Sequence, residues 1–163
     1  MMSKKEYHFS FDEYSSSNEL TSPDAALLEQ ARLITNNAYA PYSKFLVGAV
    51  AILANGKIIA GTNQENASYP VGLCAERSLM ATAGTQFPGV AIETMAISYR
   101  NATNNGHYPI SPCGMCRQAL QEFEERTQHP IRLILAGLQG AVFIIEKSSQ
   151  LLPLAFTGKE LLK

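Results

Sequence analysis

Residues 131–147 read IRLILAGLQGAVFIIEK, two apolar runs with a very short link between them. Residues 131–137 and 141–147 are both rich in Ile, Leu and Val, which is typical of strands. Only Leu138, Gln139 and Gly140 join them, whereas a parallel crossover needs about a dozen residues. We therefore expect two antiparallel strands that are neighbours in one sheet.

Upstream of this pair, three more segments have the composition of strands. Residues 45–53 and 57–60 flank the dipeptide Asn55-Gly56. This dipeptide is a strong hairpin signal, because both turn residues of a tight hairpin adopt positive φ. Residues 91–99 form the remaining apolar run. The sequence therefore predicts a sheet of five strands.

Three helices are expected to pack on this sheet. The first begins at Ser22-Pro23-Asp24, which combines a capping hydroxyl, a proline at the first helical position and an acid. Pro41 is expected to end it, since the residue before a proline avoids helical geometry. Two shorter helical segments cover residues 75–83 and 114–126. The predicted fold class is α/β, a three-layer α/β/α sandwich around a five-stranded mixed sheet.

The length of the chain is typical of a single domain, and its balanced charge does not favour a highly charged binding partner. We divide the 163 residues into a loosely ordered N-terminal arm, residues 1–21, and a single domain, residues 22–163. Lys and Arg number 13 against 14 Asp and Glu, which gives no electrostatic reason to expect nucleic acid or an anionic membrane as partner. The N-terminal residues lack the apolar stretch of a secretory signal, so we expect a cytoplasmic protein.

All three cysteines lie in two short segments, each where a loop enters a predicted helix. The segments are Cys74-Ala75-Glu76-Arg77 and Ser111-Pro112-Cys113-Gly114-Met115-Cys116-Arg117-Gln118. Zinc prefers a tetrahedral set of nitrogen or sulfur ligands, and a catalytic site leaves one position open for water. Helix N-termini favour thiolate over thiol. The sequence therefore predicts one Zn²⁺ held by Cys74, Cys113 and Cys116, with Glu76 near enough to reach the water.

The charge of such a site suggests a role for two arginines. Zn²⁺ with three thiolates is formally anionic, which weakens its ability to acidify water. Arg77 and Arg117 lie close to the ligands in the chain. Either arginine could donate hydrogen bonds to the sulfurs and thereby offset the negative charge, and we hypothesise that Arg77 does so.

With these segments in view, the chain resembles the small, homotetrameric cytidine deaminases of the cytidine and deoxycytidylate deaminase family. Zinc deaminases share a ligand two residues before a glutamate, followed by P-C-x-x-C. Here Cys74 stands where other zinc deaminases have histidine. Three further segments resemble the family at compatible spacing: residues 42–49 (YSKFLVGA), 63–70 (NQENASYP) and 151–156 (LLPLAF). The resemblance covers about residues 24–162.

The resemblance also implies a fold of the cytidine deaminase type and roles for single residues. Phe45 would pack on the pyrimidine ring, and Asn63 and Glu65 would hold the sugar hydroxyls. The homotetramer it implies would place the tail of one subunit in the site of the next. The remaining substrate-binding candidates are Tyr69, the backbone at Ala75 and Ser111, and Phe156 of that tail.

The implied reaction is the hydrolytic deamination of cytidine and 2'-deoxycytidine to uridine and 2'-deoxyuridine, with release of ammonia, as in pyrimidine salvage. A zinc-activated water is the nucleophile. Glu76 moves a proton from this water to the ring, acting first as general base and then as general acid. The partner is therefore a small pyrimidine nucleoside.

Other interpretations of the same residues stay open. A lone C-x-x-C also occurs in redox pairs, and His107 could complete a closed structural zinc site. A blasticidin-type deaminase has the same zinc signature but acts on an analogue without a normal ribose diol. A zinc-binding interaction module without catalysis predicts no turnover and indifference to Glu76. Polynucleotide deaminases would need a basic channel, which the balanced charge does not favour.

Overall fold

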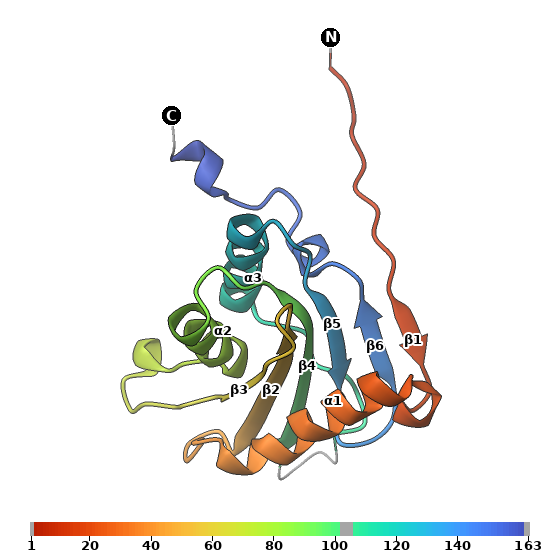
Figure 1. Cartoon of the computed structure of the whole chain (residues 1–163), viewed down its shortest axis with the longest axis vertical. Helices are drawn as coiled ribbons and strands as arrows, with labels where there is room; N and C mark the ends of the chain where they lie inside the picture. The colour runs from red at the N-terminus through yellow and green to blue at the C-terminus, as the bar shows by residue number, and fades with distance from the viewer. Residues whose placement is uncertain (1, 102–105, 162–163) are drawn as a thin grey trace.

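The computed structural model describes residues 2–101 and 106–161, which form an α/β fold around one mixed sheet (Figure 1). The sheet has the strand order β1-β6-β5-β4-β2-β3. The strands are β1 (Asp12–Tyr14), β2 (Phe45–Leu53), β3 (Ile58–Thr62), β4 (Ile92–Asn101), β5 (Arg132–Ala136) and β6 (Val142–Ile145).

The pairing of the strands makes the sheet mixed. β5 and β6 are antiparallel neighbours, so the prediction from their short link is confirmed. β2 and β3 form the antiparallel hairpin expected around Asn55-Gly56. Of these two turn residues Gly56 has a positive φ, of 76°, whereas Asn55 does not, contrary to the expectation for a tight hairpin. β4 and β5 are the parallel pair, and α3 lies between them in the chain. This agrees with the rule that parallel neighbours need a long connection.

The expected count of five strands is wrong, because the described part of the chain contributes a sixth. β1 comes from the segment expected to be loosely ordered, and it pairs antiparallel with β6. The pairing satisfies backbone groups of β6 that would otherwise form an open edge. Beside it, the ring of Phe11 packs against that of Phe143 on β6, with ring centroids 4.9 Å apart. A strand of only 3 residues is too short to show an alternating pattern in the sequence.

Helices cover both faces of the sheet (Figure 1). α1 (Ser22–Ile34) packs on β2 and β4 from one side, whereas α2 (Ala75–Gln86) and α3 (Gly114–Thr127) lie on the other. The N-cap of α1 is Thr21, one residue before the expected Ser22. The Thr21 hydroxyl accepts a hydrogen bond from the Asp24 amide.

The first helix ends earlier than the sequence predicted. α1 stops at Ile34 and continues only as a short 3₁₀ turn (Thr35–Asn37), well before Pro41. Beyond this turn the backbone of Tyr39 pairs with residues 63–65, donating to the carbonyl of Asn63 and accepting from the amide of Glu65. The chain therefore leaves the helix to make these long-range hydrogen bonds, which a local sequence pattern does not reveal.

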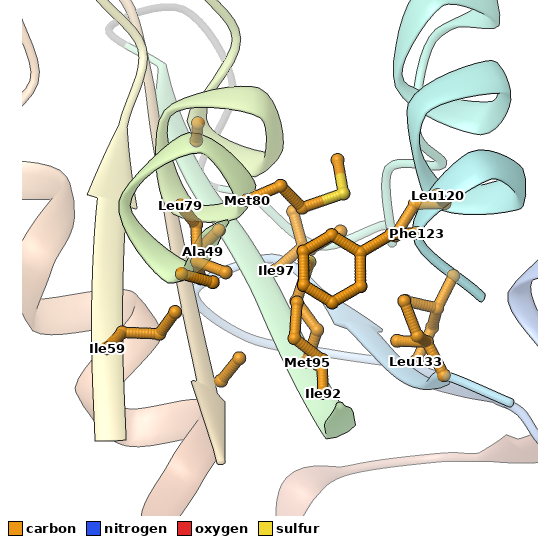
Figure 2. Packing of buried hydrophobic residues seen from close by; sticks show 14 of the residues in the cluster. Ala49, Ile59, Leu79, Met80, Ile92, Met95, Ile97, Leu120, Phe123 and Leu133 are labelled. Carbon is orange, nitrogen blue, oxygen red and sulfur yellow. The ribbon is translucent and has the colours of Figure 1, made fainter. Parts of the chain in front are cut away.

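The larger part of the core lies between the sheet and the pair α2 and α3. Figure 2 shows side chains of the two helices meeting those of the central strands. Leu79 of α2 and Leu120 of α3 are fully buried there, as are Ile92 and Met95 of β4. This packing fixes the two helices relative to each other, and with them their N-terminal ends. No helix in the described residues is long and apolar enough to cross a membrane.

Candidate metal and substrate site

The three cysteines converge at the N-terminal ends of α2 and α3. Cys74 and Cys113 are the residues that immediately precede these helices, and Cys116 lies in the first turn of α3. The Sγ atoms of Cys74 and Cys113 are 3.8 Å apart, and those of Cys113 and Cys116 are 3.5 Å apart. All three sulfurs lie within 4.8 Å of one another.

This arrangement fits Zn²⁺ by donor type and by distance. Zinc–thiolate bonds are about 2.3 Å long, so two sulfurs of a tetrahedral site are about 3.8 Å apart. The observed sulfur separations match that edge closely. Among residues 2–101 and 106–161, His107 is exposed and does not join the cluster. Three protein ligands leave the fourth position open, as a catalytic site requires.

The thiols of Cys74 and Cys116 change each other's pKa in opposite directions. Hydrogen bonding with Cys116 lowers the pKa of Cys74 to about 6, with smaller favourable contributions from Cys113 and from the charge of Arg77. The same hydrogen bond raises the pKa of the Cys116 thiol, and burial adds to the rise. Cys74 is therefore a thiolate near neutral pH, whereas metal binding must displace the proton of Cys116.

Glu76 lies in the first turn of α2, two residues after Cys74. Only 5% of its surface is exposed, and this burial raises the pKa of its carboxyl group. Ala75 beside it is fully buried. A buried carboxyl beside the ligand cluster, with a raised pKa, is suited to taking up and releasing a proton.

The two arginines behave differently. The charge of Arg77 lowers the pKa of Cys74, although Arg77 donates no hydrogen bond to a cysteine sulfur within the described residues. Arg117 donates from Nε to the carbonyl of Pro112 at 2.8 Å and from Nη1 to the carbonyl of Leu151 at 3.0 Å. The described hydrogen bonds of Arg117 therefore go to backbone carbonyls and not to sulfur.

Asn63 is held by the first residues of β2, and Glu65 by the segment that leads into this strand. The side chain of Asn63 accepts from the amide of Val47 and donates to the carbonyl of Phe45, both at 2.8 Å. Glu65 accepts from the Tyr42 amide at 2.9 Å and from the backbone and hydroxyl of Ser43.

These contacts fix both side chains where β3 ends. The Ser43 hydroxyl is the main reason that the pKa of Glu65 is lowered, so the carboxylate stays ionised and able to accept hydrogen bonds.

The aromatic candidates have different surroundings. Phe45 is half-buried and stacks on Tyr99 of β4, with ring centroids 4.9 Å apart and an interplanar angle of 18°. Tyr69 is 74% exposed, and its ring lies 6.1 Å from that of Tyr42. Tyr99 did not enter the sequence-based set, although an aromatic in a strand next to β2 was a signal that could have suggested it.

Ser111 and Phe156 lie on opposite sides of Cys113 in the chain. Ser111 is exposed and precedes the ligand by two residues, so its backbone belongs to the same loop. Phe156 is 58% exposed, and its carbonyl accepts a hydrogen bond from the side chain of Gln118 on α3 at 2.9 Å. Its ring therefore remains available to another molecule.

Comparison with known proteins agrees with this geometry. The family model described as the cytidine and deoxycytidylate deaminase zinc-binding region matches residues 21–129. A cytidine deaminase of Halalkalibacterium halodurans is 36% identical over 137 residues, which are 83% of this chain and 95% of that protein. A cytidine deaminase of Mycoplasma pneumoniae is 44% identical over 96 residues, 58% of this chain and 68% of that protein.

Solved structures show the same likeness. The crystal structure of cytidine deaminase from Burkholderia pseudomallei superposes with a TM-score of 0.71 at 37% identity, covering 84% of this chain and all of that one. That of cytidine deaminase from Mycobacterium leprae gives 0.61 at 30% identity, covering 82% of this chain and 98% of that one. The chain therefore belongs to the cytidine and deoxycytidylate deaminase family, whose zinc-binding region it shares.

Proposed function

We propose that this protein hydrolyses the exocyclic amine of cytidine and 2'-deoxycytidine, giving uridine or 2'-deoxyuridine and ammonia. The observation that carries the proposal is a buried Glu76 in the first turn of α2, two residues after Cys74, which is one of the three clustered thiols. Relatives named cytidine deaminase support the choice of substrate.

Cys74, Cys113 and Cys116 would hold Zn²⁺, which would supply the Lewis acidity that lowers the pKa of a water molecule. Glu76 then does the proton transfer. Its carboxylate accepts a proton from the attacking water and donates it to N3 of the pyrimidine. It then accepts the proton of the hydroxyl group added at C4 and donates it to the departing amine, so that C4=O forms as ammonia leaves. Because Glu76 is buried, it exchanges these protons with the substrate in preference to bulk solvent.

The remaining candidates hold the nucleoside against this centre. Asn63 and Glu65, fixed where β3 ends, offer the amide and carboxylate groups that bind ribose hydroxyls. Phe45, itself stacked on Tyr99, gives an aromatic surface for the pyrimidine ring. Tyr69 and the backbone at Ala75 and Ser111 complete the proposed substrate contacts. A ribose site of this kind favours a true nucleoside over an analogue that lacks the diol.

A homotetramer completes the proposed enzyme. In the chain itself Leu154 and Phe156 stand exposed on the tail, at 104% and 58%. A second subunit would bury these apolar side chains and could receive Phe156 at its own site. A monomer in light scattering that retains full turnover would contradict this assembly. Salvage of pyrimidines in the cytoplasm is the cellular role that fits such an activity.

The direct test is conversion of cytidine by the zinc-loaded protein. Deamination changes the ultraviolet absorbance of the pyrimidine, and chromatography identifies the product. We expect uridine and ammonia in equal amounts. No conversion of cytidine, with zinc bound and the protein folded, would reject this substrate. The same assay with modified cytosine nucleosides would then distinguish a blasticidin-type deaminase from a zinc module without activity.

A further inference from the structure

Arg117 lies in the first turn of α3 and makes hydrogen bonds in two directions. Nε donates to the carbonyl of Pro112 at 2.8 Å, and Nη1 donates to the carbonyl of Leu151 at 3.0 Å. Pro112 directly precedes Cys113 and is buried. One of the two donors therefore fixes the peptide that carries a zinc ligand.

The other acceptor, Leu151, belongs to the 3₁₀ turn Ser148–Leu151, which follows β6. α3 holds this turn at a second point through Glu124. The carboxylate of Glu124 accepts from the Ser148 hydroxyl at 2.7 Å and from the Ser149 amide at 3.4 Å. Arg117 and Glu124 are separated by about two helical turns, so they lie on the same face of α3.

The charges of Glu124 and Arg117 match the backbone groups at the two ends of the turn Ser148–Leu151. A short helical turn presents free amides at its start and free carbonyls at its end. Here the acidic Glu124 binds the start and the basic Arg117 binds the end. These contacts therefore favour the orientation in which the turn docks on α3.

The next residue of α3 binds further along the same segment. The side chain of Gln118 donates to the carbonyl of Phe156 at 2.9 Å. The first turns of α3 thus hold the C-terminal segment at Leu151 and again at Phe156. The same turns contain the ligand Cys116 and follow directly after the ligand Cys113.

We infer that Arg117 is a positioning residue that couples the Pro112–Cys113 peptide to the C-terminal segment. It sets the position of the Cys113 sulfur through geometry and not through its charge. The inference rests on the proposed zinc site and goes beyond it, because it makes metal binding depend on a segment distant in sequence. A planar guanidinium donates from two fixed nitrogens, whereas the single ammonium nitrogen of lysine cannot reproduce that fork.

The experiment compares Arg117→Lys and Arg117→Gln with the wild type. Zinc affinity is measured by competition with a chelator, and ligand geometry by the visible absorption of the protein loaded with Co²⁺. Arg126→Gln is the matched control, because Arg126 lies in the last turn of the same helix and stacks on Phe123 at 4.1 Å. Melting temperature and circular dichroism show whether each variant is folded.

Loss of a residue that orients a metal ligand typically weakens metal affinity about 10–100-fold. We expect both Arg117 variants to fall in this range with altered Co²⁺ spectra, and Arg126→Gln to keep the wild-type spectrum and affinity. Wild-type behaviour of Arg117→Lys, with only Arg117→Gln defective, would overturn the inference in favour of a charge effect. Unfolding of both variants would overturn it in favour of general stabilisation. Zinc affinity is read without turnover, so an inactive wild type would reject the proposed function and leave this comparison intact.

Discussion

At Glu76 the side chain is placed by helix geometry and isolated by packing. Its position in the first turn of α2 brings it beside Cys74, and only 5% of its surface is exposed. Burial disfavours the charged carboxylate and raises its pKa. A carboxyl group with a raised pKa takes up a proton more readily near neutral pH. A solvated first-turn acid would have neither property.

Glu76→Gln tests the proton transfer directly. Glutamine has nearly the same shape but cannot carry a proton between water and substrate, so we expect turnover to fall by about 10²–10⁴-fold. The zinc content should be unchanged, because Glu76 is not a ligand. Turnover is measured by absorbance and zinc by atomic absorption. Retained activity in this variant would contradict the proposed mechanism.

Asn63→Ala should cost both stability and substrate binding. The change leaves the Val47 amide and the Phe45 carbonyl without their side-chain partner, and an unmade hydrogen bond of this kind costs about 1–3 kcal/mol. We also expect KM to rise. Urea unfolding and steady-state kinetics measure the two effects. Asn66→Ala is the control, since the Asn66 side chain accepts a hydrogen bond from the nearby Ser68 amide in an exposed loop. An equal loss there would contradict the role given to Asn63.

At the scale of elements, α1 is tied to β5 by one ion pair. Arg132 donates two hydrogen bonds to Asp24, at 2.8 and 2.9 Å. Burial alone would raise the pKa of Asp24, but the hydrogen bonds and charge of Arg132 outweigh it and lower the pKa. A carboxyl with a lowered folded-state pKa stabilises the fold above its unfolded pKa.

This contribution should disappear as the pH falls through the folded-state pKa of Asp24. We expect the difference in unfolding free energy between wild type and Asp24→Asn to be constant above about pH 5 and to shrink below about pH 4. Urea unfolding across this range measures it. Glu146→Gln is the control, because Glu146 binds the same arginine but is 68% exposed. A difference independent of pH would show that the ion pair is not its source.

The short strand β1 is a second feature of this scale. A variant that lacks residues 1–15 loses the pairing with β6 and the contact between Phe11 and Phe143, whereas one that lacks residues 1–6 keeps both. We expect the longer deletion to cost about 1–2 kcal/mol and the shorter one almost nothing. Thermal melting measures both. Equal melting temperatures would mean that β1 does not protect the sheet edge.

At the scale of the whole molecule, the metal site joins parts that are distant in sequence. Cys74 and Cys113 are 39 residues apart and come from two helices. An ion bound to both restrains the two helices in the folded state and has no equivalent site in the unfolded chain. Zinc should therefore stabilise the fold as well as support the reaction.

Removal of zinc tests this link. A ligand present at about 1,000 times its Kd adds about 4 kcal/mol, which for a chain of this size corresponds to roughly 10 °C in Tm. We expect a chelator to lower Tm by this order and added zinc to restore it. Cys74→Ser should respond little to either. A chelator effect of the same size in that variant would place the stabilising metal elsewhere.

Particular residues show which parts of the fold and of the metal site could be predicted from the sequence. The antiparallel pair β5 and β6 followed from a short link, and the hairpin from Asn55-Gly56, because both depend on local chain geometry. The zinc ligands followed from thiol chemistry and spacing, joined to a resemblance in sequence. β1 was missed because 3 residues carry no periodicity. The early end of α1 was missed because Tyr39 pairs with residues 63–65.

The sequence by itself determined five of the six described strands, the three described α-helices and the donor set for zinc. Those properties arise from neighbouring residues and from the chemistry of single side chains. Only the tertiary structure decided which distant groups meet: Phe45 on Tyr99, Arg117 between Pro112 and Leu151, and β1 along β6. Such contacts depend on how the sheet and both helix layers pack together, because each backbone group finds its partner only once the whole core has formed.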